Sequence, residues 1–132
     1  MRRTTILKAT AYAIAAAQIA LGSAYLLVPA GFDRLLGLST APAWTTWPLQ
    51  MSGARFLAFG FGMLLVARRP LAHRGWIQAM IAVQALDWIS TVTNVARGTV
   101  ALAQVGTASF LPLLFVAGLL IGYPRAQAAA NR

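Results

Sequence analysis

Residues 48–67, PLQMSGARFLAFGFGMLLVA, form an apolar run that contains a single charged residue, Arg55. A helix advances about 1.5 Å per residue, so about 20 apolar residues suffice to cross the ~30 Å hydrocarbon core of a bilayer. Trp44 and Trp47 precede the run and Arg68 follows it, as is typical of the water interfaces of a membrane helix. The stretch therefore predicts a transmembrane helix.

Three further segments of similar length and character flank this run, at residues 4–28, 75–95 and 99–123. The apolar part of the first segment is longer than the roughly 7–15 residues of a signal-peptide core, so we interpret it as a retained helix. The sequence therefore predicts an all-α fold, an integral membrane four-helix bundle that forms one domain over residues 1–132.

Composition supports a membrane protein over a soluble one. The chain has 132 residues, of which 59% are hydrophobic and 10% charged, whereas a soluble domain carries about a quarter charged residues. The net charge of +9 does not indicate a nucleic-acid site, because the basic residues neither cluster on one segment nor alternate with stacking aromatics. We therefore expect the lipid bilayer as a partner and no nucleic acid.

Most basic residues lie on one predicted side of the bundle. This group comprises Arg2, Arg3, Lys8, Arg68, Arg69, Arg74, Arg125 and Arg132, whereas the two opposite loops carry only Arg34 and Arg97. Because cytoplasmic loops of membrane proteins are enriched in Lys and Arg, both termini are predicted to be cytoplasmic.

The chain has no cysteine and one histidine, His73, in a predicted basic loop. This composition excludes disulfides, thiolate metal sites and bis-histidine haem ligation within one chain, and no metal site is expected. In the loop before residue 48, the stretch GFDRLLGLS (31–39) predicts a short interfacial helix that ends near Gly37. Pro112 predicts a kink inside the fourth helix.

Small residues recur at four-residue spacing on several predicted helices, which indicates close packing within the bundle or between copies. These positions are Ala9, Ala13, Ala17, Ala16, Ala20 and Ala24 in the first helix, Ala54, Ala58 and Gly62 in the second, and Gly118 and Gly122 in the fourth.

A polar stripe runs along the third predicted helix. Its members share one helical face: Gln84, Asp87, Ser90, Thr91 and Asn94. Since unpaired polar groups in lipid are costly, the stripe is predicted to face the bundle interior or a water-filled cavity. Together with Gln18 of the first helix, these side chains suit hydrogen bonding to a ligand headgroup or carbonyl better than metal binding.

Arg55 and Asp87 are the only charged residues well inside the predicted spans, and helix lengths place them at nearly the same depth. We therefore predict an ion pair between them. A purely structural role, in which the pair fixes helix register, and a functional role as catalytic candidates both remain open.

Three features resemble the DoxX-like group of small bacterial four-helix membrane proteins: the stretch PAGFDRLLGL (29–38), the stretch GARFLAFGFG (53–62) and the aspartate in ALDW (85–88). The resemblance covers about residues 20–95. It implies a bundle in the bacterial cytoplasmic membrane, suggests that Arg55 and Asp87 matter, and transfers no reaction. Members with a known role are similar to a small membrane subunit of a thiosulfate:quinone oxidoreductase, or partner redox proteins at the membrane.

Three functions are compatible with these patterns. The leading hypothesis is an accessory or anchoring subunit of a membrane assembly that is redox-linked and binds quinone or another lipophile, with membrane or redox proteins or further copies as partners. The second is a membrane-embedded enzyme that acts on a lipophilic small molecule with Asp87 as acid or base. The third is a small dimeric transporter, which pairing of Asp87 with Arg55 would disfavour.

Overall fold

The computed structural model describes residues 2–35, 37 and 42–124, and every regular element in these ranges is helical. The elements in chain order are α1 (Arg2–Leu27), α2 (Pro29–Leu35), η1 (Ala43–Thr45), α3 (Thr46–Arg68), α4 (Arg74–Ala96), α5 (Leu102–Val105), η2 (Gly106–Ser109) and α6 (Leu111–Gly122). The all-α prediction is confirmed, and the first three predicted long helices correspond to α1, α3 and α4.

Three helical stretches are long and apolar enough to cross a membrane, namely Arg2–Leu27, Ala43–Arg68 and Leu102–Gly122. They are candidate spans of a multi-pass membrane protein. Helix α4 has 23 residues, the same length as α3, but the predicted polar stripe lowers its hydropathy. Lipid tolerates such a stripe where it faces protein or water.

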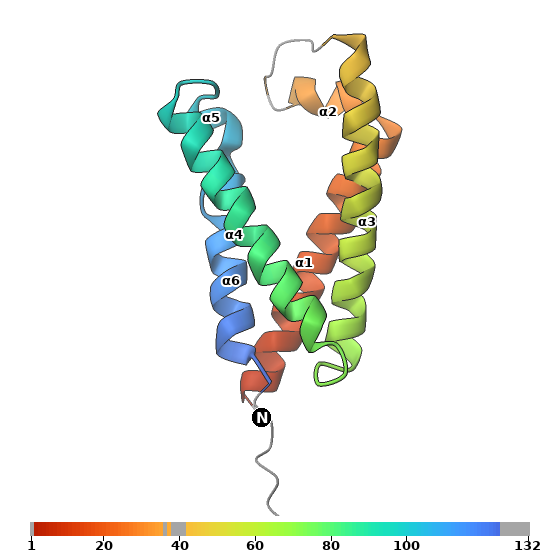
Figure 1. Ribbon diagram of the computed structural model, residues 1–132, viewed down its shortest axis with the longest axis vertical. Helices are drawn as coiled ribbons and strands as arrows, with labels where there is room; N and C mark the ends of the chain where they lie inside the picture. The colour runs from red at the N-terminus through yellow and green to blue at the C-terminus, as the bar shows by residue number, and fades with distance from the viewer. Residues whose placement is uncertain (1, 36, 38–41, 125–132) are drawn as a thin grey trace, which may run out of the picture.

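Helices α1 and α3 form the first arm of the molecule and lie side by side along their length (Figure 1). Two glycines allow the backbones of these helices to touch. A Cβ added to Gly22 would lie 2.8 Å from the Gly53 carbonyl oxygen, and a Cβ added to Gly53 would lie 2.8 Å from the Gly22 carbonyl oxygen. Further along, Gly60 lies against Ile19 in the same way. Close approach of this kind is how membrane helices associate without a hydrophobic driving force.

The glycines, and not the predicted alanine stripes, make this interface. Ala13, Ala16 and Ala20 of α1 are exposed, and so are Ala54 and Ala58 of α3. The interface side of α1 carries other small residues, the buried Ala11, Ala15 and Gly22. Four-residue spacing occurs on several faces of an alanine-rich helix, so the sequence pattern could not choose the face that packs.

Helices α4 and α6, together with α5 and η2, form the second arm (Figure 1). The indole Nε1 of Trp88 donates a hydrogen bond of 2.9 Å to the Ser109 carbonyl oxygen, and Gln78 Nε2 donates one of 3.0 Å to the Tyr123 hydroxyl. Helix α6 also packs on α1, because Gly118 lies against Thr10 and Gly122 against Leu7. Gly118 and Gly122 therefore pack within the chain, which is one of the two arrangements that their spacing left open.

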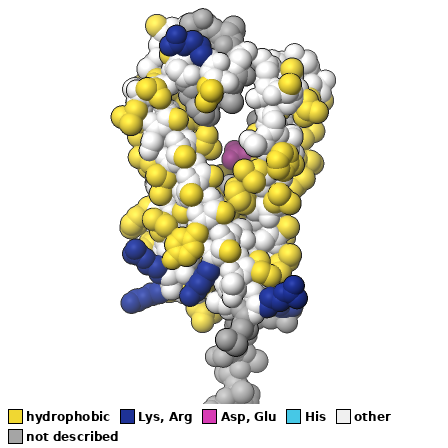
Figure 2. All heavy atoms as spheres, turned by 180° about the vertical axis from the view of Figure 1, so that it is seen from behind, with side chains coloured by type: hydrophobic (Ala, Val, Ile, Leu, Met, Phe, Trp, Pro, Cys, Tyr) yellow, Lys and Arg dark blue, Asp and Glu magenta, His cyan; other side chains and the backbone are white. Residues whose placement is uncertain are grey.

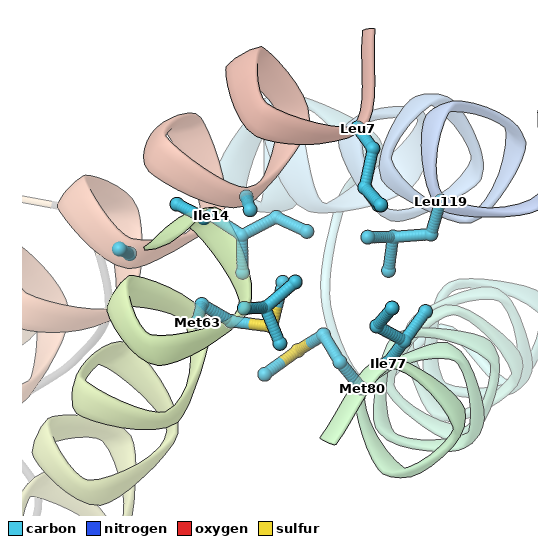
Figure 3. Close-up of a cluster of buried hydrophobic side chains, with 10 residues drawn as sticks. Leu7, Ile14, Met63, Ile77, Met80 and Leu119 are labelled. Carbon is cyan, nitrogen blue, oxygen red and sulfur yellow. The ribbon is translucent and has the colours of Figure 1, made fainter. Parts of the chain in front are cut away.

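A hydrophobic core joins the two arms near the end of the molecule at which α1 begins. The largest fully buried side chains of the core come from all four long helices: Leu7, Ile14, Met63, Val66, Ile77, Met80 and Leu119 (Figure 3). Beside this core, Gly62 of α3 lies against the Trp76 ring of α4. We call this half of the molecule the core end, and the half that carries α2 and α5 the opposite end.

Local signals explain where the helices stop. After α4, the Gly98 N–H binds the Val95 oxygen and the Thr99 N–H binds the Asn94 oxygen, both at 3.0 Å, which is a Schellman motif. Gly98 has φ +70°, a conformation that costs other residues energy. Gly37, with φ +69°, follows α2 in the same way, so the predicted short helix and its stop are both present.

The predicted fourth helix is not continuous. Helix α5 ends at Val105, a 3₁₀ turn follows, and α6 begins at Leu111. Pro112 therefore does not kink the interior of a helix, but stands in the first turn of α6. A proline is favoured there because the N–H groups of the first turn have no partner within the helix.

Candidate functional site

A hollow separates the two arms toward the opposite end (Figure 2). It exists because α3 packs along α1 and α4 packs along α6, whereas α3 and α4 diverge from their contact at Gly62 and Trp76 (Figure 1). The arms meet again at the far tip, where Gln104 Nε2 of α5 donates a hydrogen bond of 3.1 Å to the Gly37 carbonyl oxygen. We call this space, between the core and the Gln104–Gly37 bond, the inter-arm hollow.

Two buried glutamines lie at the hollow side of the core. Gln18 is one helical turn beyond Ile14 on α1, and Gln84 is one turn beyond Met80 on α4, so both follow core residues in the direction of the opposite end. Their side chains are only 5% and 4% exposed. Gln84 Nε2 lies 3.5 Å from the Met80 sulfur, a weak acceptor.

Gln18 carries an unused acceptor. Its Oε1 is buried and has no hydrogen-bond partner among the residues that the structure describes. A buried polar atom without a partner costs about 1–3 kcal/mol, so such atoms in proteins call for a physical explanation. A bound hydroxyl or amide donor would satisfy it.

Asp87 lies three residues beyond Gln84 on α4, and its side chain is exposed. Figure 2 shows an acidic side chain (magenta) at the foot of the hollow, and Asp87 is the one acid whose side chain the structure describes. The carboxylate is thus available to a molecule that enters between the arms.

The rest of the predicted stripe follows Asp87 along α4. Thr91 Oγ1 donates to the Asp87 carbonyl oxygen at 2.8 Å, and Asn94 Nδ2 donates to the Ser90 carbonyl oxygen at 2.9 Å. Both are bonds to the preceding turn of the same helix, which satisfy polar donors in an apolar environment. Thr91 and Asn94 retain their acceptor oxygens for a ligand, and Ser90 is exposed.

The predicted ion pair between Arg55 and Asp87 is not formed. Neither residue makes an ion pair with any other residue in the described ranges, and both side chains are exposed. The prediction assumed that α3 and α4, as consecutive antiparallel helices, pack along their whole length. They separate instead, because each has another partner: α1 for α3, and α6 for α4.

Two contacts that shape the hollow are not evident from the sequence. The Trp88–Ser109 bond anchors α4 to the turn before α6, and the Gln104–Gly37 bond joins the tips of the arms across 67 positions of the chain. Gln104 Oε1 also accepts from the Ala101 N–H at 2.8 Å, so one side chain both caps α5 and links the arms. A single glutamine in a short apolar helix carries no sequence signal for such a partner.

The arrangement suits binding of a molecule that is apolar and has a polar head. The polar groups on this part of α1 and α4 are the Asp87 carboxylate, the buried amides of Gln18 and Gln84, and the oxygens of Ser90 and Thr91. Within the described ranges, no three His, Cys, Asp or Glu side chains come together as a metal site would need. Comparisons of the chain with models of protein families, with curated proteins and with solved structures find no match.

Proposed function

We propose that this protein crosses the bacterial cytoplasmic membrane four times, with both termini cytoplasmic, and holds a lipophilic molecule with a polar head in the inter-arm hollow. The observation that carries the proposal is Gln18 Oε1, a buried acceptor without a partner in the described residues. The exposed carboxylate of Asp87 on α4 adds a second polar group. The reduced form of a quinone, a quinol, fits this chemistry, because its ring hydroxyls can donate to the Gln18 oxygen and its isoprenoid tail is apolar.

The topology is supported by the placement of the ends. Helix α1 begins where α6 ends, since Gly122 lies against Leu7, and this is compatible with an even number of crossings if α4 also spans. Most of the basic side chains visible in Figure 2 lie at that end of the molecule, as expected of a cytoplasmic side, although Figure 2 also shows a basic side chain at the opposite end.

As to biological role, we propose an accessory or anchoring subunit of a membrane assembly, redox-linked in keeping with the DoxX-like resemblance. Such a subunit would supply the lipophile site, and a partner protein would supply the redox group. Affinity purification from native membranes at mild detergent concentration is expected to recover a partner. Isolation as a stable homo-oligomer with an occupied hollow would contradict this role.

The binding proposal is tested by titrating a short-chain quinone analogue, in its reduced quinol form, into the purified protein in micelles and following tryptophan fluorescence. The variant Gln18→Leu is expected to bind more weakly by about 10-fold, since one net hydrogen bond contributes about 0.5–1.5 kcal/mol and the bound polar atom would lose its only partner there. The matched control is Gln78→Leu, which removes an exposed glutamine at the core end and leaves the hollow unchanged.

The stability of the Gln18→Leu variant also distinguishes a binding defect from misfolding. Removal of an unsatisfied buried amide is expected to leave the ligand-free protein as stable as before, or more stable. Equal quinone affinity of the wild type and Gln18→Leu, with Gln78→Leu also unchanged, would refute the proposed site.

A membrane-embedded enzyme is the second candidate. It is favoured by the finding that Asp87 forms no ion pair with any residue that the structure describes. An arginine beside the carboxylate would hold it in its charged form and limit it as an acid or base, and Arg55 does not occupy that position. In this case Asp87→Asn would abolish turnover of a lipophilic substrate while the fold survives. Unchanged turnover would remove Asp87 from the mechanism.

A further inference from the structure

A second recess lies at the core end, away from the inter-arm hollow. It has a volume of about 630 Å³ and lies between the start of α1, the turn that joins α3 to α4, and the end of α6. Three cationic side chains line it: Arg3, Lys8 and Arg69. The rest of the lining is largely apolar and includes Leu7, Leu71 and Tyr123.

Among the described residues, the three cations have no acidic partner. All three side chains are exposed, and none forms an ion pair with another described residue. The sequence has only two acids, Asp33 in α2 at the opposite end and Asp87 beside the hollow. No acidic side chain of the described residues therefore balances the charge of this recess, and an anionic molecule would do so.

Another cation lies close to the recess and stays in place through an aromatic contact. The Arg74 guanidinium lies 5.3 Å from the centre of the Tyr123 ring, which is a cation–π geometry. This contact fixes the ring that forms one wall of the recess and adds positive potential there.

The apolar part of the lining decides the chemical class of the occupant. Leu71 is 65% exposed, although it lies in a turn among basic residues, and Leu7 and Tyr123 continue the apolar surface into the recess. A free phosphate would use the cations and leave these walls in water. An anionic phospholipid uses both, because its phosphate meets the cations and its glycerol and first methylenes meet the walls. Basic recesses between membrane helices on the cytoplasmic side commonly bind such headgroups.

We propose that the recess formed by Arg3, Lys8, Arg69 and Leu71 binds the headgroup of an anionic phospholipid. The bound lipid contacts α1, the α3–α4 turn and the end of α6, so it stabilises the core end, where the two arms meet. This site is independent of the ligand in the hollow, and neither proposal depends on the other.

The test uses the full chain in neutral detergent micelles, with phosphatidylglycerol, phosphatidylcholine or inorganic phosphate added. Native mass spectrometry is expected to show retained phosphatidylglycerol in preference to phosphatidylcholine, and phosphatidylglycerol is expected to raise the unfolding temperature. Each basic residue near an anionic headgroup contributes about 1 kcal/mol, so the double variant Lys8→Gln/Arg69→Gln should bind phosphatidylglycerol about 25-fold more weakly.

The matched control is Arg97→Gln, which removes one exposed cation at the opposite end and should leave lipid binding unchanged. Equal retention of the two lipids by the wild type would overturn the proposal without recourse to any variant. So would unchanged binding by the double variant, or displacement of phosphatidylglycerol by millimolar inorganic phosphate, which would show a site for phosphate alone. Because these measurements involve no quinone, a negative result would not affect the proposal for the inter-arm hollow.

Discussion

The contact between Gly22 and Gly53 is the feature on which the first arm depends most, and Gly22→Ala tests it. The added methyl group would lie 2.8 Å from the Gly53 oxygen and 2.9 Å from Leu57 Cδ2. The Gly53 oxygen belongs to the backbone of α3, which cannot move as a flexible side chain can. Overpacking of this kind costs about 1–3 kcal/mol, and the intrinsic helix preference of Ala over Gly returns at most about 1 kcal/mol. We expect a net loss of about 1–2 kcal/mol in the free energy of unfolding.

The control for this substitution is Gly75→Ala. A Cβ at Gly75, in the first turn of α4, has nothing within 4 Å, so the substitution should be neutral or slightly stabilising. Unfolding in micelles of rising sodium dodecyl sulfate content, followed by far-ultraviolet circular dichroism, gives both values. If Gly22→Ala unfolds at the same dodecyl sulfate fraction as Gly75→Ala, the close backbone packing of α1 on α3 is refuted.

Three further predictions concern the turns and the tips of the arms. Gly98→Ala forces a side chain into a backbone with φ +70° and should lower the free energy of unfolding by about 1–2 kcal/mol; an unchanged unfolding curve would contradict the Schellman assignment. Gln104→Ala removes the bond to Gly37 and should cost only about 1 kcal/mol, but it should speed quinone release in stopped-flow fluorescence; an unchanged rate would mean that the tips do not control access. The chain has no native cysteine, so single cysteines can be introduced at Ala72 and Thr99, on either side of α4. An impermeant maleimide should label them from opposite sides of a sealed vesicle. Labelling from the same side would contradict a spanning α4.

Helix boundaries could be read from the sequence because they follow from local signals. The long apolar runs, the interfacial tryptophans and the stop glycine at position 37 act within a few residues of one another. Gly98 ends α4 by the same kind of local signal, but only the structure identified it. The prediction of one continuous fourth helix was wrong, because the apolar run at 99–123 gives no sign of the break at residues 106–110. Pro112 gave a true signal there, but it marks the start of α6 and not a kink.

The candidate site could be predicted only in part, because its shape depends on which helices pair. The polar stripe on α4 and the buried Gln18 are local patterns and were evident. The Arg55–Asp87 pair was inferred from depth alone, and depth does not determine the angle between two helices. Contacts such as Trp88 Nε1 with the Ser109 carbonyl set that angle, and they join residues whose sequence neighbourhoods give no sign of each other.

Photolabelling with a diazirine-bearing quinone analogue, reduced to its quinol form, tests most directly whether the inter-arm hollow receives a lipophilic molecule. In lipid nanodiscs, mass spectrometry of the digested protein should locate the adducts on α4 between Gln84 and Thr91 and on α1 near Gln18. Excess unlabelled quinone should suppress these adducts, and Gln18→Leu should reduce them. Adducts spread evenly over the exposed apolar surfaces, such as Leu113 and Leu120 of α6, and insensitive to competitor would contradict the claim.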